Sequence, residues 1–187
     1  SQGVSIVNSE SELSSVIKNM FDSHQFGDAI YLEELLQGEE ITITIMPPGD
    51  YVIGNKTVKK DKHWPLPPVK RFNHQNGIAP YNGTVAVINN SAVLTDEEIQ
   101  NPKIQKAMIE CEKAAAIVQA KAPIRIDCRA NDKGEFLLFD LNMKPNMTGA
   151  SRPQRQDQDS LTALSARKIG WTFDDLIMNM LNQSWHI

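Results

Sequence analysis

The chain has 187 residues, of which 41% are apolar and 22% are charged, with a formal net charge of −4 and a pI near 5.6. This length allows one good core or two small lobes that share a cleft, and the acidic balance excludes an obvious nucleic-acid or membrane-binding patch. No apolar run approaches the roughly 18 residues of a membrane span, and no signal-peptide pattern opens the chain. We therefore expect a globular, cytoplasmic protein.

The chain begins with the small-residue stretch Ser1-Gln2-Gly3-Val4-Ser5, which is unusual for a native amino terminus. We therefore expect a fragment of a longer protein. The stretch is also similar to the second half of a phosphate-cradling loop, although glycine-serine loops occur in many kinds of protein.

The first predicted element is an amphipathic helix over residues 10–23. Ser9 and Glu12 have the spacing of a capping box, and apolar residues follow at helical offsets. A strand over 29–36 comes next, and the alternation of Ile and Thr over 41–46 is typical of a half-buried strand.

Residues 54–83 are rich in proline, glycine, asparagine and lysine, which favours a loop or hairpin around a short strand at 65–72. Such a segment could close over a site or be a plain surface excursion. The later predicted elements are a strand over 84–89, a helix from Pro102 to about 120, strands over 124–130 and 135–142, a helix over 160–169 and a helix after Thr172. This order of helices and antiparallel hairpins predicts the α+β class.

The last two predicted strands form a hairpin with charged side chains at alternate positions. A four-residue turn over 131–134 would set Arg125 opposite Asp140 and Asp127 opposite Leu138. The hairpin would then hold its charged groups in a fixed register.

Four polar residues of this hairpin are expected on one face: Arg125, Asp127, Asp140 and Asn142. Asp127 and Asp140 would be diagonal neighbours about 7–8 Å apart, which leaves room for a cation. Two carboxylates and an amide oxygen suit magnesium, and an arginine beside them would attract phosphate oxygens. The alternative is a surface hairpin with an ordinary Arg125–Asp140 ion pair, but the small-residue loop over 145–151 favours an anion site.

An acidic segment over residues 33–40 begins within the predicted strand 29–36 and joins it to the strand 41–46. A hinge of this kind can offer backbone groups to an adenine edge and carboxylates to the exocyclic amine or the ribose hydroxyls. Acidic turns are usually solvated, so this segment alone leaves both interpretations open.

Together, these segments resemble the ATP-grasp superfamily, and within it the D-alanine–D-alanine ligases. That family carries a glycine/serine loop, an acid-acid hinge strand, an Arg-apolar-Asp strand and a Glu-apolar-Asn-x-x-Pro strand end. The counterparts here are SQGVS, YLEELLQGEE, Arg125-Ile126-Asp127 and Asp140-Leu141-Asn142-Met143-Lys144-Pro145. The resemblance implies an α+β ATP-grasp fold whose antiparallel sheets and helices form two lobes around a nucleotide cleft. Residues 1–48 would belong to the small lobe, and residues 49–187 would form the larger carboxyl-terminal lobe with the metal site.

The resemblance also implies the role of each site residue. The expected nucleotide-binding residues are Ser1, Gln2, Gly3, Val4 and Ser5 of the loop, Glu33 at the adenine amine, Leu36 at the ring and Glu40 at the ribose. The expected ligands of magnesium, or of manganese in its place, are Asp127, Asp140 and Asn142. Arg125 would stabilise the transferring phosphoryl group, while the Asn146 N–H and Ser151 would face the carboxylate-bearing substrates.

Two of these positions depart from the family pattern. Asp140 stands where the family usually has Glu, and Asn146 replaces a glycine. The family's amino-terminal domain and the lysines ahead of its phosphate loop have no counterpart in this sequence. Lys70 or Arg71 could supply a phosphate contact instead, and the spacing does not choose between them.

The function implied by the resemblance is ATP-dependent ligation of a carboxylate to an amine through an acyl phosphate. The expected partners are small-molecule substrates and the missing amino-terminal domain, with neither nucleic acid nor membrane. One alternative is an ATP- and magnesium-binding module, or an inactive fragment, without ligase turnover. Another is an ATP-grasp enzyme that stops after phosphorylation.

Two further residue types are expected to be structural. Cys111 and Cys128 lack metal-ligand spacing and are expected as buried free thiols. The scattered histidines are expected at the surface, and among them only His74 is retained as a site candidate.

Overall fold

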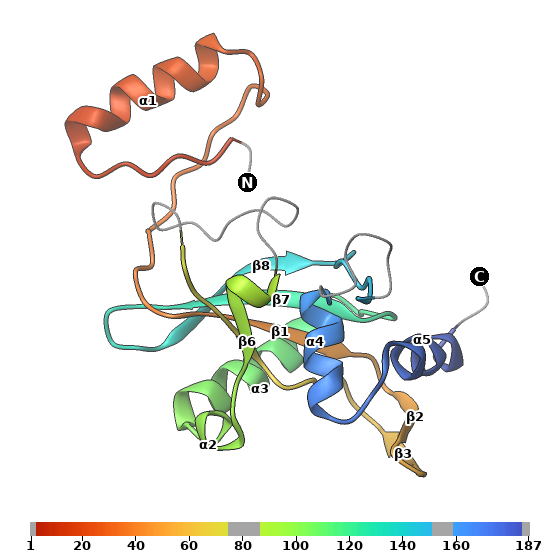
Figure 1. Ribbon diagram of the computed structural model, residues 1–187. Helices are drawn as coiled ribbons and strands as arrows, with labels where there is room; N and C mark the ends of the chain where they lie inside the picture. Colours follow the sequence, from red (N-terminus) through yellow and green to blue (C-terminus); the bar gives the residue numbers. More distant parts are fainter. Residues whose placement is uncertain (1–2, 75–86, 151–158, 185–187) are drawn as a thin grey trace. The chain divides into compact units, whose positions relative to one another are not determined.

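A computed structural model describes residues 3–74, 87–150 and 159–184 (Figure 1). The chain divides into an amino-terminal unit, Ser1–Leu36, and a carboxyl-terminal unit, Gln37–Ile187. The lobe boundary expected between residues 48 and 49 stays a prediction. Strand β1 (Glu40–Met46), which precedes that boundary, nevertheless pairs with β7 (Ile124–Ala130), which follows it.

Helix α1 (Glu10–Asp22) of the amino-terminal unit confirms the helix predicted over 10–23. Ser9 caps it, because the Ser9 Oγ accepts a hydrogen bond from the Glu12 backbone N–H at 3.3 Å. The Glu12 carboxylate accepts in return from the Asn8 backbone N–H at 3.0 Å, one residue before the position that a capping box uses.

The strand predicted over 29–36 is wrong, because the structure assigns no strand to residues 23–39. The apolar side chains of Tyr31 and Leu32 are 81% and 63% exposed. A strand requires a neighbouring strand that pairs with its backbone N–H and C=O groups. An apolar sequence with high strand propensity does not supply that neighbour.

A six-stranded antiparallel sheet forms the centre of the carboxyl-terminal unit (Figure 1). The strand order is β6-β5-β1-β7-β8, and β4 also pairs with β1. The strands not yet given are β4 (Trp64–Pro65), β5 (Val69–Arg71), β6 (Ser91–Val93) and β8 (Phe136–Asn142). The strands predicted over 41–46, 124–130 and 135–142 are therefore confirmed, and the short strand at 65–72 appears as β4 and β5.

All seven residues of β1 are buried, so the expectation of a half-buried strand is wrong. The Ile side chains of β1 pack towards helix α3 (Pro102–Ile117). On the other side, the Thr44 and Thr162 Oγ1 atoms lie 3.1 Å apart, and Thr162 belongs to helix α4 (Leu161–Lys168). The Ile/Thr alternation thus separates two covered faces of a central strand, not core from solvent.

Helix α3 starts where proline predicts it, with Asn101 as the cap. The Asn101 Oδ1 accepts from the Lys103 backbone N–H at 3.0 Å. The buried stripe of α3 faces the sheet and includes Cys111, whose Sγ lies 3.5 Å from the Sγ of Cys128 on β7. Both cysteines are free and buried, as predicted.

A second sheet has two strands, β2 (Gly49–Ile53) and β3 (Lys56–Lys60). The loop-like composition of this part of the sequence did not predict these two strands. The rings of Tyr51, Trp64 and Trp171 cluster beside it, with centroids 5.0–6.1 Å apart. Helix α5 (Phe173–Asn182) also holds the hairpin, because the Asn179 Oδ1 accepts from the Val52 N–H at 2.7 Å.

Helix α4 packs against β1, β5 and β6 of the large sheet, whereas α5 packs against α4 and β2. The strand predicted over 84–89 is wrong in its second half, since Val87–Asn89 form a 3-10 turn, η1, and residues 84–86 lie outside the described residues. A short helix, α2 (Asp96–Ile99), was not predicted, whereas α4 and α5 confirm the two helices expected near the end. Within the described ranges, no helix has the length and apolar character needed to span a bilayer.

Candidate functional site

One face of the large sheet carries most of its polar side chains, and we call it the polar face. The strand register puts the following residues on it: Glu40, Thr42 and Thr44 of β1, Arg71 of β5, Ser91 of β6, Arg125, Asp127 and Arg129 of β7, and Asp140 and Asn142 of β8. The face towards α3 carries Ile41, Ile43, Ile45, Ile124, Ile126 and Cys128. The polar face is therefore where binding and chemistry would be located.

The β7–β8 hairpin has a different register from the one predicted. Asp127 lies opposite Asp140 and Arg125 lies opposite Asn142, instead of Arg125 opposite Asp140. The turn is one residue longer than expected, because the Asn131 backbone N–H bonds to the Glu135 carbonyl at 2.9 Å.

A β-bulge completes this change of register. Cys128 pairs with Leu138, but the next residue back, Asp127, pairs with Asp140, so Phe139 has no partner in the ladder. A bulge is invisible to a pattern argument that assumes strict alternation. The prediction that both aspartates share a face with Arg125 and Asn142 nevertheless agrees with the observed pairs.

Asp127 is held by two neighbours on the polar face. The Thr42 hydroxyl donates to its Oδ1. Arg125 donates from Nε to Oδ1 and from Nη2 to Oδ2, both at 3.1 Å, in a two-pronged contact. Arg125 and Asp127 are each 8% exposed, so this ion pair is buried and fixed in place. Sequence reasoning missed Thr42, although its place opposite Asp127 follows from the β1–β7 register.

Asp140 is the more exposed carboxylate of the pair. Burial raises its pKa, the nearby Asp127 raises it further, and Arg125 partly offsets both. Residues directly opposite on antiparallel strands have Cα atoms about 4.5–5.5 Å apart, which is closer than the diagonal spacing expected from the sequence. Two carboxylates on facing residues, balanced by the charge of only one arginine, suit a bound cation.

Asn142 completes the predicted ligand set, and its Oδ1 accepts a hydrogen bond from the Lys144 N–H at 3.3 Å. Among the described residues, no group of three or more His, Cys, Asp or Glu side chains could hold a metal. The predicted set has two carboxylates and one amide, so a magnesium site at Asp127, Asp140 and Asn142 stays a prediction.

The loop after β8 is fixed by local hydrogen bonds. The Asn146 Oδ1 accepts from the Thr148 N–H at 3.0 Å and from the Thr148 hydroxyl at 2.8 Å. Asn146 is not among the residues with positive φ, so replacing the family's glycine imposes no left-handed backbone here. Its proposed contact with a substrate stays a prediction.

Asp159 anchors the far end of this loop, and sequence reasoning missed it. Its carboxylate is buried, accepts from the Ala150 N–H at 3.0 Å and is paired with Arg167 of α4. The carboxylate raises the pKa of the Arg167 guanidinium, mainly through this hydrogen bond. A lone Asp in a polar stretch carries no sequence signal for this role.

Glu40, the predicted ribose ligand, is 5% exposed and lies opposite Arg71 on one side and Arg129 on the other. Its Oε2 lies 2.8 Å from the Nε2 of His74, whose side chain is 17% exposed. His74 is therefore a partly buried partner of Glu40, and the expectation of a surface histidine is wrong for this residue. The contact supports keeping it as a site candidate.

Other predicted nucleotide-binding residues belong to the amino-terminal unit. Gly3, Val4, Ser5 and Glu33 are exposed and Leu36 is partly buried, all in irregular segments. Ser1, Gln2 and Ser151 lie outside the described residues. The roles of these residues stay predictions.

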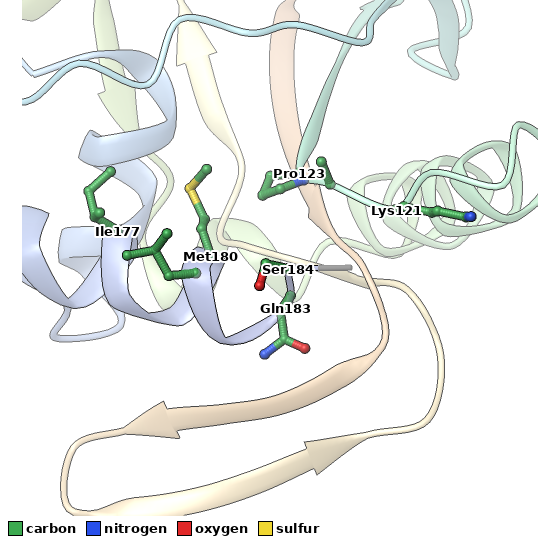
Figure 2. A pocket seen from close by; sticks show the side chains of 8 residues that line it. Lys121, Pro123, Ile177, Met180, Gln183 and Ser184 are labelled. Carbon is green, nitrogen blue, oxygen red and sulfur yellow. The ribbon is translucent and has the colours of Figure 1, made fainter. Parts of the chain in front are cut away.

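A pocket lies elsewhere among the described residues (Figure 2). It has a volume of about 370 Å³ and is lined by Lys121, Ala122, Pro123, Ile177, Met180, Leu181, Gln183 and Ser184. Figure 2 shows α5 on one side and the segment before β7 on the other. None of the predicted site residues lines it, and its apolar walls offer little to a nucleotide.

Residues 1–182 match the family model described as "D-ala D-ala ligase C-terminus". The chain belongs to this family. The match covers nearly the whole chain, including both aspartates and the loop after β8.

The D-alanine–D-alanine ligase C-terminus family assignment agrees with individual relatives. A D-alanine–D-alanine ligase of Pseudoalteromonas translucida is 24% identical over 186 residues, which are 97% of this chain and 50% of that protein. One from Buchnera aphidicola is 26% identical over 179 residues, covering 96% of this chain and 49% of that protein. The chain spans about half the length of the curated relatives it matches.

Solved structures show the fold of this family member. The Bacillus anthracis D-alanine–D-alanine ligase complexed with ATP has a TM-score of 0.60 at 18% identity, covering 97% of this chain and 48% of that one. The VanG D-Ala:D-Ser ligase of Enterococcus faecalis has a TM-score of 0.62 at 14% identity, covering 94% and 44%. The predicted α+β ATP-grasp fold is confirmed.

Proposed function

We propose that this chain is the nucleotide- and metal-binding part of a cytoplasmic ATP-dependent ligase that joins a carboxylate to an amine. The observation that carries the proposal is that Asp127 and Asp140 face each other and that Arg125 donates two hydrogen bonds to Asp127. Membership of a ligase family supports it. D-alanine is the first substrate to test, because the relatives are named for it.

The proposed reaction has two steps. A carboxylate oxygen attacks the γ-phosphorus of ATP, the bond to the bridging oxygen breaks, and ADP leaves. The amine nitrogen then attacks the acyl carbon of the acyl phosphate, loses a proton and releases inorganic phosphate. Both steps concentrate negative charge on phosphoryl oxygens, so fixed positive charge is what the protein must supply.

Arg125 is suited to that task because its orientation is set before any substrate arrives. Its two hydrogen bonds to Asp127 fix the guanidinium plane, and the Thr42 hydroxyl holds the carboxylate from the other side. Little reorganisation is then needed when charge develops on the phosphoryl group. The loop over 145–150, held by Asp159, would position the substrate carboxylate.

The residues present fit magnesium. Asp127, Asp140 and Asn142 would hold it. Burial and, after it, the neighbouring Asp127 carboxylate raise the pKa of the Asp140 carboxyl, and a cation would offset the repulsion between the two carboxylates. When bound, the ion would neutralise the phosphate oxygens of ATP. Glu33 and Leu36 are the proposed contacts of the adenine, and Glu40 is the proposed contact of the ribose.

The test is calorimetric binding of ATP to the intact protein, with and without magnesium, in wild type and Asp140→Ala. We expect the variant to lose the metal-dependent part of the affinity, about tenfold or more, and to keep its affinity for adenosine. Asp132→Ala is the matched control, because Asp132 is exposed in the turn of the same hairpin. Equal magnesium enhancement in wild type and Asp140→Ala would refute the site.

Turnover separates the ligase from a binding module. A ligase should release ADP only when a carboxylate and an amine are both present, and D-alanine supplies both groups. Magnesium-dependent ATP binding without ADP release from any amino-acid pool would support the module, and a stable phosphorylated product would indicate a kinase-like enzyme.

A further inference from the structure

Two neighbouring cations of β5 lie on opposite faces of the sheet. Lys70 lies on the side of α2, where its Nζ contacts the Glu98 carboxylate at 2.7 Å. Arg71 pairs across the ladders with Glu40 and with Ser91, so it lies on the polar face. The structure therefore separates two residues that sequence spacing could not rank.

The Nε of Arg71 has no acceptor among the described residues, although it is buried. Glu40 lies directly opposite, but its carboxylate contacts His74, and no salt bridge between described residues joins it to Arg71. Buried N–H groups are nearly always hydrogen-bonded in folded proteins, so an unsatisfied one on a binding face points to a ligand.

On β6, the cross-strand partner of Arg71 is Ser91, which shares the polar face with it. The Ser91 hydroxyl donates to the Asn90 Oδ1 at 2.8 Å, and Ser91 is 4% exposed. Within the described residues, the neighbouring strand therefore supplies no acceptor for the Arg71 Nε.

The electrostatic surroundings of Arg71 link this residue to the metal site. Burial lowers the pKa of the Arg71 guanidinium, the carboxylates of Glu40 and Asp127 act against this, and Arg125 reinforces it. Arg71 is thus in electrostatic range of Asp127 while bonded to neither carboxylate. A ligand with negative oxygen atoms would accept from the free Arg71 Nε and offset the burial of the charge.

We propose that Arg71 forms an oxyanion subsite on the polar face that carries the predicted metal site, and that this subsite takes a phosphate group of the nucleotide or the carboxylate of a substrate. Arginine suits this role because its planar fork of N–H groups matches both oxyanions. The proposal rests on the proposed function in that the oxyanion belongs to a reactant of ligation.

The test compares Arg71→Met with the matched control Lys70→Met in the intact protein, with the probes ATP, adenosine and acetate in calorimetry. If the oxyanion is a phosphate, Arg71→Met weakens ATP binding about tenfold or more and leaves adenosine unchanged. If it is a carboxylate, the same variant loses acetate binding and keeps its affinity for ATP. Lys70→Met should match wild type with every probe.

Two further variants keep the test independent of folding. Arg71→Lys retains the charge but not the Nε donor, so it should bind the affected probe more weakly than wild type and more tightly than Arg71→Met. Ser91→Ala, which removes the cross-strand neighbour of Arg71 but no guanidinium donor, should bind the same probe nearly as wild type does. The proposal is overturned if Arg71→Met binds ATP and acetate as wild type does, or if wild type binds neither.

The outcome is distinct from that of the proposed function. Unchanged magnesium enhancement in Asp140→Ala would refute the metal site while leaving an Arg71-dependent anion site in place. Conversely, a metal-dependent ATP site with no effect of Arg71→Met on either anion would leave the ligase and remove the subsite.

Discussion

The two faces of the large sheet are made by the same strands, and the central strands β1 and β7 are buried on both faces, yet the faces differ in chemistry. In β7, Ile126 is 0% exposed and its neighbour Asp127 is 8% exposed. Ile126 faces the core under α3, whereas Asp127 is bonded to Arg125 and Thr42. Burial alone therefore does not separate the structural face from the functional one.

The difference lies in what burial does on each side. Removing Ile side chains from water stabilises the fold in proportion to the area buried. Removing an arginine and an aspartate from water costs free energy that their mutual contact only offsets. The polar face is thus a region where stability is given up to hold charges in fixed positions, as expected for a site.

The largest effect should follow from breaking the polar face at Arg125. We expect Arg125→Met to lower kcat for ligation about 100- to 1000-fold, because the fixed positive charge at the phosphoryl group is lost. Steady-state ADP release by the intact protein measures this. Since Asp127 would keep only Thr42 as a partner, the urea midpoint should fall as well. Wild-type turnover in this variant would show that Arg125 only neutralises Asp127.

A change on the apolar face should have the opposite profile. Ile43 is 0% exposed, so Ile43→Ala should lower the free energy of unfolding by about 2–4 kcal/mol through lost burial and a cavity. Urea unfolding measures this, and Ile43→Val should cost about 0.5–1.5 kcal/mol as the graded control. The folded fraction should bind ATP as wild type does. A selective loss of ATP affinity would mean that the two faces are not independent.

The smallest effect concerns the cation on the side of α2. Lys70 lowers the pKa of the Glu98 carboxyl from 4.5 to about 2, chiefly through their hydrogen bond, with help from the Thr95 cap. The stabilisation is therefore present above pH 4.5 and is lost as the pH falls towards 2. Both side chains are more than a third exposed, so we expect less than about 1 kcal/mol. Urea midpoints between these pH values should fall less steeply in Glu98→Gln, and identical slopes would contradict the assignment.

Strong local signals made much of the fold predictable. The Ser9 cap, the proline at the start of α3 and the alternation in β1 each act within a few residues, and each element exists. The prediction of a strand over 29–36 was wrong because strand pairing depends on two segments and not on one. Burial of both faces of β1 likewise depends on α3 and α4, which are distant in the sequence.

The site was predicted in part. The shared face of Arg125, Asp127, Asp140 and Asn142 follows from alternation and was correctly inferred, although the pairing itself was wrong. Thr42, Asp159 and the choice of Arg71 over Lys70 depend on which strands are neighbours and on which donors are left unsatisfied. No single-sequence pattern contains that information.

The unpaired Phe139 has a consequence for the chemistry of the whole hairpin. If Phe139 instead paired with Asp127 in strict alternation, Asp140 would lie opposite Ile126. The side chains of Asp140 and Asn142 would then lie on the apolar face, towards helix α3 and away from any reactant. Because Phe139 is left out of the ladder, the side chains of Asp140 and Asn142 lie on the same face as Arg125.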